Sequence, residues 1–135
     1  MDFYREEILD HYSHPRNFGD LPNATHTARE ANASCGDLIE IALIIQEKTV
    51  DHTPIQIIHD VRFKGIGCAL SIATASMLSE KVKGKPIEDV LKMKDDELTQ
   101  LLGVEVTPTR MKCVTLPLRA FQRALAEFSI VAHEK

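Results

Sequence analysis

The stretch with the most evident chemical potential is residues 32–37, Asn-Ala-Ser-Cys-Gly-Asp, which leads directly into an apolar run. It places a thiol, Cys35, and a carboxylate, Asp37, two residues apart with a single glycine between them. In an extended chain, side chains at positions i and i+2 point to the same face. Sulfur and oxygen could therefore lie side by side where a strand begins, and the question is which other groups meet them.

Two further cysteines, Cys68 and Cys113, complete the set of three. Each is expected at an element boundary: Cys35 before a strand, Cys68 at the start of a helix, and Cys113 in the loop before the last helix. A helix N-terminus favours the thiolate, which is the form that binds metal or attacks sulfur. Lys112 and Arg110 place positive charge near Cys113 and would favour a thiolate there too.

The residues alone leave plainer interpretations open. A lone cysteine in a cytosolic domain is most often a small buried hydrophobe. The 32 and 44 residues between successive cysteines match no short metal-binding motif. Cys-Gly-Asp can equally be a turn that opens a strand, with Asp37 accepting hydrogen bonds from nearby amides. The histidines are scattered, and His59, on a predicted strand, is the one to check as a ligand.

The bulk composition is that of an ordinary globular domain, with 44% hydrophobic and 27% charged residues in 135. We expect residues 1–135 to form one domain. The net charge of −4 argues against nucleic acid as a partner. No apolar run is long enough to cross a membrane, and the first residues do not resemble a signal peptide. The odd number of cysteines fits a reducing compartment, so a cytoplasmic location is expected.

Periodicity and turn signals predict strands first and helices afterwards. Val- and Ile-rich runs predict strands at 38–46 and 55–63 around a turn at 51–54, with a weaker strand at 24–31. The predicted helices are 2–13, 69–81, 86–93, 95–102 ending at Gly103, and a last helix with Pro117 in its first turn that carries Leu118, Phe121, Leu125, Phe128 and Ala132 on one stripe. This order predicts an α+β fold in which helices pack on one face of a three-stranded antiparallel sheet.

Four motifs, in order along essentially the whole chain, resemble the IscU/SufU/NifU N-terminal family of iron–sulfur cluster assembly proteins. They are Asp-His-Tyr-Ser-His-Pro-Arg-Asn at 10–17, Ser-Cys-Gly-Asp at 34–37, Arg-Phe-Lys-Gly-Ile-Gly-Cys-Ala at 62–69 and Lys-Cys at 112–113. The resemblance implies a SufE/IscU-like fold. It also implies one exposed site of three cysteines and an aspartate at the end of the sheet.

Carried over to this chain, the implied site is Cys35, Asp37, Cys68 and Cys113. The resemblance implies that it binds zinc or iron as a transient [2Fe–2S] cluster and accepts sulfur from a cysteine desulfurase. Thiolates select zinc and iron–sulfur clusters. A carboxylate in place of a fourth thiolate should hold iron less tightly, which suits a cluster that must leave.

The chain departs from both branches of that family. Lys112 stands where IscU proteins have a histidine, and Val-Thr-Pro-Thr-Arg at 106–110 replaces the Leu-Pro-Pro-Val-Lys segment that an Hsp70-type chaperone recognises. Chaperone-driven release is therefore doubtful. The lysine resembles SufU proteins, but the 44 residues between Cys68 and Cys113 leave no room for the insertion that SufU proteins usually carry.

Three functions follow from these residues and this resemblance. The first is a non-enzymatic scaffold that assembles a [2Fe–2S] cluster and passes it to apo iron–sulfur proteins. The second is a zinc-dependent sulfurtransferase in which Cys113 accepts a persulfide, and the third is an inert structural zinc site. The implied partners are a cysteine desulfurase, apo-proteins and an iron donor, and the chain is either a monomer or a transient dimer.

Overall fold

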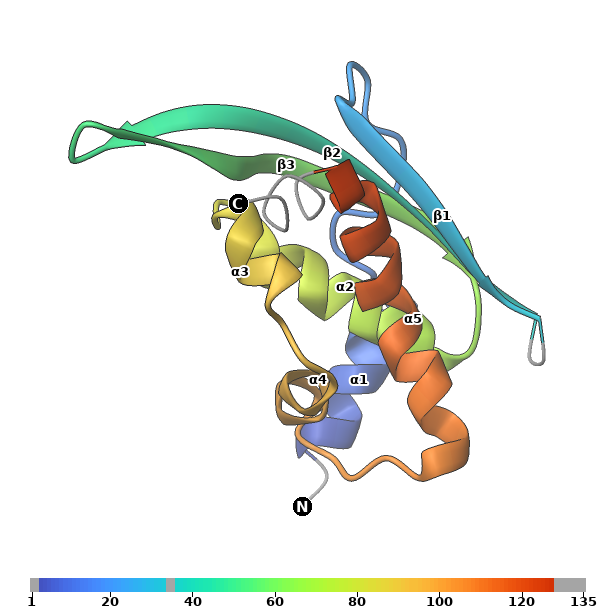
Figure 1. Ribbon diagram of the computed structural model, residues 1–135. Helices are drawn as coiled ribbons and strands as arrows, with labels where there is room; N and C mark the ends of the chain where they lie inside the picture. The colour runs from blue at the N-terminus through green and yellow to red at the C-terminus, as the bar shows by residue number, and fades with distance from the viewer. Residues whose placement is uncertain (1–2, 34–35, 128–135) are drawn as a thin grey trace.

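A computed structural model describes residues 3–33 and 36–127 of the chain. In chain order its elements are α1 (Phe3–Ser13), β1 (His26–Asn32), β2 (Asp37–Val50), β3 (Thr53–Ile66), α2 (Ala69–Val82), α3 (Ile87–Leu91), α4 (Asp95–Leu102) and α5 (Pro108–Ala124). Figure 1 shows a curved sheet with the helices gathered on its concave side. The predicted α+β class and helix-covered sheet are confirmed. No helix within the described ranges is long and apolar enough to cross a membrane.

The sheet is antiparallel with the strand order β1-β2-β3. The β2–β3 pairing runs from Leu38 opposite Ile66 to Val50 opposite Thr53, so both strands are longer than the sequence predicts. The reason is the turn: Asp51 and His52 both have positive φ, which is typical of the two-residue turns that continue the strand ladder on both sides. The predicted four-residue turn at 51–54 was therefore too long.

The core lies between the inner face of the sheet and the helices. Alternate residues Ile39, Ile41 and Leu43 of β2 are fully buried, as period-two alternation in a half-covered strand requires. Helix α2 is buried from Ser71 to Ser79 because α1, α5 and β3 all pack against it. Its small side chains allow that close packing, and they bring several hydroxyl groups into the interior.

The last helix begins nine residues earlier than the prediction placed it. Pro108, and not Pro117, occupies the first turn, and Thr107 is the N-cap. Pro117 instead lies inside α5, where it has no N–H to donate to the Cys113 carbonyl one turn earlier. The helix ends at Ala124, and the predicted positions Phe128 and Ala132 lie outside the described residues.

A buried histidine, His11, joins α1 to α2. His59, the histidine that the sequence singled out to check as a ligand, is exposed. His11 is 6% exposed, and its Nδ1 lies 2.7 Å from the Ser76 Oγ. The Arg16 backbone N–H donates to the same oxygen at 2.8 Å. Burial lowers the pKa of His11, the Arg16 cation lowers it further, and the Glu80 carboxylate opposes the shift, with smaller opposing contributions from Glu7 and Asp10.

This lowered pKa predicts a pH-dependent stability. Because the pKa of His11 is lower in the folded protein, the unfolded chain takes up a proton on this histidine more readily. The contribution of neutral His11 to the free energy of unfolding is therefore complete above the ordinary pKa of 6.5. It is lost as the pH falls from 6.5 towards the folded-state pKa. Urea unfolding should show stability falling between pH 7 and pH 5, by at most about 1.4 kcal/mol per pH unit. His11→Gln, which does not titrate, should flatten that part of the profile. An unchanged profile in the variant would assign the effect to other groups.

Candidate metal and cluster site

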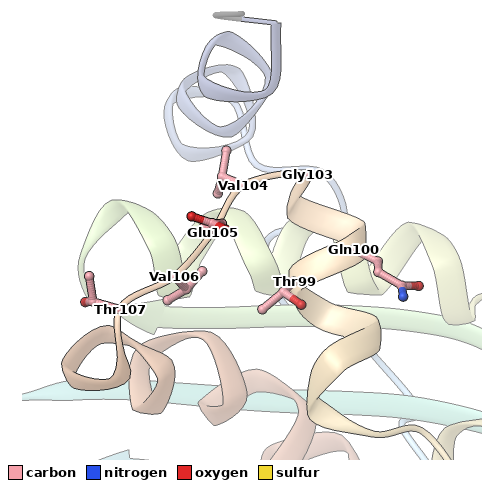
Figure 2. Close-up of a pocket in the computed structure, with 7 residues that line it drawn as sticks. All are labelled: Thr99, Gln100, Gly103, Val104, Glu105, Val106 and Thr107. Atoms are coloured by element: carbon pink, nitrogen blue, oxygen red, sulfur yellow. The ribbon is translucent and has the colours of Figure 1, made fainter.

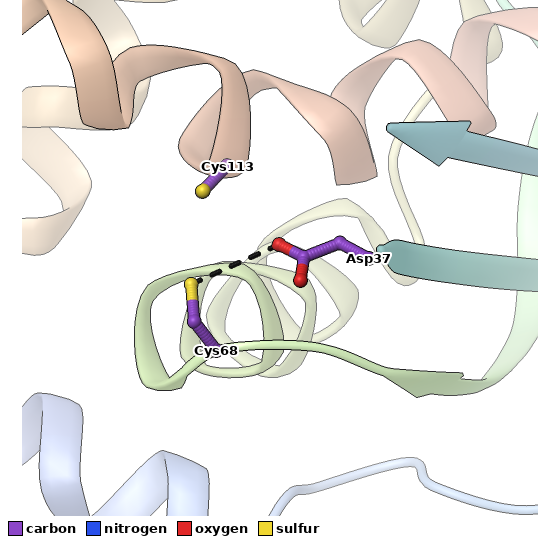
Figure 3. Close-up of side chains that lie close together, drawn as sticks. All are labelled: Asp37, Cys68 and Cys113. Atoms are coloured by element: carbon purple, nitrogen blue, oxygen red, sulfur yellow. Dashed lines mark hydrogen bonds between the residues drawn. The ribbon is translucent and has the colours of Figure 1, made fainter. Parts of the chain in front are cut away.

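Three side chains from distant parts of the chain converge at one end of the sheet. Asp37 begins β2, Cys68 precedes α2, and Cys113 lies in the second turn of α5. Their ligating atoms all lie within 4.8 Å of one another, and Figure 3 shows the three side chains facing a common space. Cys35, the fourth residue of the predicted site, lies outside the described residues.

Asp37 reaches the site because β2 begins with it. It pairs with Asn32 of β1, and the intervening turn is closed by a hydrogen bond from the Gly36 N–H to the Asn32 carbonyl at 2.8 Å. Gly36 has a φ of 76°, a conformation that other residues adopt at a cost. Asp37 is only 4% exposed, so the carboxylate points away from water and towards the two thiols.

Cys68 occupies the N-cap position of α2, as the sequence predicted. Its backbone is extended, and its side chain makes no capping hydrogen bond to the helix. Instead its Sγ lies 3.8 Å from the Asp37 Oδ2, within hydrogen-bonding distance for sulfur. The sulfur therefore lies at the N-terminal end of α2, beside the Asp37 carboxyl group.

Cys113 differs from the expectation in two respects. It lies on a helix and not in a loop, because α5 begins at Pro108. It is also buried, at 5% exposed, whereas the resemblance implied an exposed site. Arg110 precedes it by three residues on the same helix and is exposed, so a positive charge can lie on the Cys113 side of α5.

Gly67 allows the site to close tightly. A methyl group added at Gly67 would overlap the Ser71 Oγ and would lie 3.2 Å from the Asp37 Cγ. The absence of a side chain therefore brings the loop before α2 into contact with both of these groups. The sequence marked Gly67 only as part of a glycine-containing approach to Cys68, and it gave no sign that Ser71 lies in the site.

The donor set suits a thiophilic metal. Two cysteine sulfurs and one carboxylate oxygen within 4.8 Å can occupy three positions of a tetrahedral zinc or iron centre. By contrast, a hollow of about 790 Å³ between α4 and α5 contains no cysteine or histidine (Figure 2). Its lining is Thr99, Gln100, Gly103, Val104, Glu105, Val106 and Thr107.

Comparison with known proteins places this arrangement in a family. The family model described as "NifU-like N terminal domain" matches residues 3–134. The chain belongs to the NifU-like N-terminal domain family. It is 33% identical over 125 residues to the iron-sulfur cluster assembly scaffold protein IscU 1 of Archaeoglobus fulgidus, covering 93% of this chain and 76% of that protein.

Relatives of the SufU type match as well. The zinc-dependent sulfurtransferase SufU of Bacillus subtilis is 34% identical over 141 residues, covering 92% of this chain and 90% of that protein. A crystal structure of a putative scaffold protein for the SUF system from Fervidobacterium islandicum superposes with a TM-score of 0.64 at 25% identity, over 89% of this chain and 94% of that one. The resemblance to both branches, expected from the motifs, is confirmed.

The contact at Gly67 gives a prediction for zinc binding. Gly67→Ala should displace Ser71 and Asp37, cost about 1–3 kcal/mol of stability as overpacking does, and weaken zinc binding measured by competition with a chromophoric chelator. Gly84→Ala is the matched control: Gly84 has a positive φ but nothing within 4 Å of an added methyl group. It should lose about 1–2 kcal/mol of stability and keep its zinc affinity. Equal zinc affinities in the two variants would show that the Gly67 contact does not shape the site.

Proposed function

We propose that this protein is a non-enzymatic scaffold that assembles a labile [2Fe–2S] cluster and passes it to apo iron–sulfur proteins. The observation that carries the proposal is the convergence of Asp37, Cys68 and Cys113 in a chain related to named IscU scaffolds. Cys35 is the proposed fourth ligand. Residues 1–135 act as one scaffold domain, with sulfur supplied by a cysteine desulfurase.

The chemistry of assembly fits these side chains. Thiolates hold the iron ions, and sulfur arrives as a desulfurase persulfide. Reducing two sulfane sulfurs to sulfide takes four electrons. Two ferrous ions supply two of them on becoming ferric, and an external reductant supplies the other two. The side chains of the scaffold hold the ions and undergo no net change.

Asp37 is the residue that keeps the cluster labile. A carboxylate is a harder ligand than a thiolate and binds iron of a sulfur-rich cluster less strongly. Asp37 also lies against Cys68. When its carboxylate dissociates from iron, the cluster is opened beside the N-terminus of α2. The open iron position can take a first ligand from the acceptor protein, and the three cysteine thiolates are then exchanged for further ligands of that protein as the cluster leaves.

The SufU relative supports a second candidate, a zinc-dependent sulfurtransferase using the same residues. In this mechanism one cysteine thiolate is released from the zinc ion and attacks the outer sulfur of the desulfurase persulfide. The S–S bond of that persulfide breaks, the desulfurase cysteine leaves as a thiolate, and the sulfur stays on this protein as a new persulfide. Cys113 is the acceptor proposed from the sequence, but the loop setting that motivated it is wrong, and Cys113 is more buried than Cys68. An acceptor at Cys113 requires the site to open, whereas Cys68 is accessible as it stands.

The scaffold proposal is tested by anaerobic reconstitution with ferrous iron, cysteine, a cysteine desulfurase and dithiothreitol as reductant. The wild type should develop the visible absorbance of a [2Fe–2S] cluster, bind iron and sulfide in equal amounts, and activate an apo-ferredoxin. Asp37→Ala should form the cluster and retain it several-fold longer, with correspondingly slower transfer. Equal cluster lifetimes in both proteins would remove Asp37 from this role.

The second candidate is tested by desulfurase turnover with zinc present and iron absent. If the protein is a sulfur acceptor, zinc-loaded wild type should stimulate turnover without forming a cluster. Cys113→Ser should abolish the stimulation if Cys113 accepts the sulfur, and Cys68→Ser should do so if Cys68 accepts it. Mass spectrometry of the trapped persulfide identifies the residue directly. Stimulation that survives both single substitutions would exclude both residues as the sole acceptor.

A further inference from the structure

Ser71 is a buried polar residue that the proposed ligand set does not use. It lies in the first turn of α2, three residues after Cys68, and it is fully buried. Its Oγ lies 3.1 Å from the Cys68 carbonyl oxygen and 3.8 Å from the Cys68 Sγ. In the described part of the chain both hydrogen-bond partners of this hydroxyl belong to Cys68.

The Ser76 hydroxyl bonds to His11 and Arg16, as described above, and two further buried hydroxyls of α2 bond to carbonyl groups of the helix itself. Thr74 donates to the Leu70 carbonyl at 2.6 Å, and Ser79 donates to the Ser76 carbonyl at 2.6 Å. These are short hydrogen bonds that use the proton of each hydroxyl within the helix, and the Ser79 oxygen also accepts from the Asn17 Nδ2 at 3.0 Å. The Ser71 hydroxyl is held more loosely by its carbonyl, at 3.1 Å, and it alone among the three also lies near a sulfur.

The Ser71 oxygen also packs closely against the backbone of Gly67. Gly67 contacts it so closely that any side chain at residue 67 would overlap the Oγ. The same glycine lies against the Asp37 carboxyl group. The Ser71 oxygen is therefore packed against the Gly67 backbone while it lies 3.8 Å from the Cys68 Sγ, and rotation of its hydroxyl can direct the proton to either Cys68 atom.

We infer that Ser71 is a positioning residue that donates a hydrogen bond to the Cys68 sulfur when Cys68 binds a metal ion. The inference rests on the proposed metal and cluster binding at Cys68. As a free thiol, Cys68 can itself donate to Asp37 or Ser71, so the Ser71 proton is directed to the carbonyl. As a metal ligand the sulfur is a thiolate with no proton, and it becomes an acceptor for the Ser71 hydroxyl.

This hydrogen bond has two consequences for a bound metal. It fixes the direction of the Cys68 sulfur, as partners of metal ligands generally do, and losing such a partner typically costs about 10–100-fold in metal affinity. It also draws electron density from the sulfur. Hydrogen bonds to cluster sulfurs are one of the factors that set the reduction potential of an iron–sulfur cluster.

The test compares Ser71→Ala with Thr74→Val in the full chain. Thr74→Val removes a buried hydroxyl from the same helix, and the recorded partner of that hydroxyl is the Leu70 carbonyl. Zinc affinity is measured by chelator competition, and cobalt is used for the sulfur-to-metal charge-transfer band. Ser71→Ala should bind zinc about 10–100-fold more weakly and shift the band to longer wavelength. Thr74→Val should match the wild type in both measurements.

A measurement on the wild type covers the case in which Ser71→Ala does not fold. In protein loaded with a spin-active cadmium isotope, the Ser71 hydroxyl proton should exchange slowly and show coupling to the metal through the Cys68 sulfur. Absence of this coupling overturns the role of Ser71. The role is also overturned if a folded Ser71→Ala variant keeps the zinc affinity and the cobalt spectrum of the wild type. Either result leaves the scaffold proposal intact. A wild type that binds none of these metals overturns both.

Discussion

The burial of the Asp37 carboxylate between two thiols is the constraint around which this end of the molecule is built. An isolated carboxylate removed from water is costly unless it is hydrogen-bonded, paired or bound to a metal. Two separate segments supply its surroundings: the loop before α2 with Gly67 and Cys68, and the second turn of α5 with Cys113. These segments reach Asp37 because α2 and α5 cover the same face of the sheet (Figure 1).

The stability needed to hold this polar cluster comes from elsewhere in the fold. The buried faces of β2 and β3 pack against α2 and α5 through large apolar side chains such as Phe63, Leu78 and Phe121. Near its C-terminal end α5 is also paired with β1, where the Arg123 Nη1 lies 2.9 Å from the Glu30 Oε1. The apolar packing that joins β2 and β3 to α2 and α5 therefore lies apart from the polar side chains of the site. This separation of support from chemistry suits the proposed binding and release of a cluster.

Much of the architecture could be predicted from sequence. Runs rich in Val and Ile around a turn located β2 and β3, and Gly103 indicated the end of α4, where that glycine adopts a φ of 73°. The start of α5 could not be located in the same way, because Pro108 and Pro117 are both suited to a first turn. The apolar spacing of Met111, Val114 and Leu118 continues the helical period upstream of Pro117 and would have favoured the earlier start.

The candidate site was only partly accessible to the same reasoning. The cysteines and Asp37 were identified by residue type and by resemblance, but their spacing along the chain says nothing about the approach of α5 to the start of β2. Ser71 carried no sequence signal because serines are common in small-residue helices, and its meaning depends on the contact with Gly67. His11 was overlooked for a similar reason, since its burial depends on how α1 packs on α2.

X-ray absorption at the zinc edge of the zinc-loaded wild type tests the central claim most directly, because it counts the ligands without reference to activity. If Cys35, Asp37, Cys68 and Cys113 form one site, the spectrum should show three sulfur atoms at about 2.3 Å and one oxygen atom at about 2.0–2.2 Å. A zinc ion surrounded only by oxygen and nitrogen, or by fewer than two sulfurs, would contradict the site.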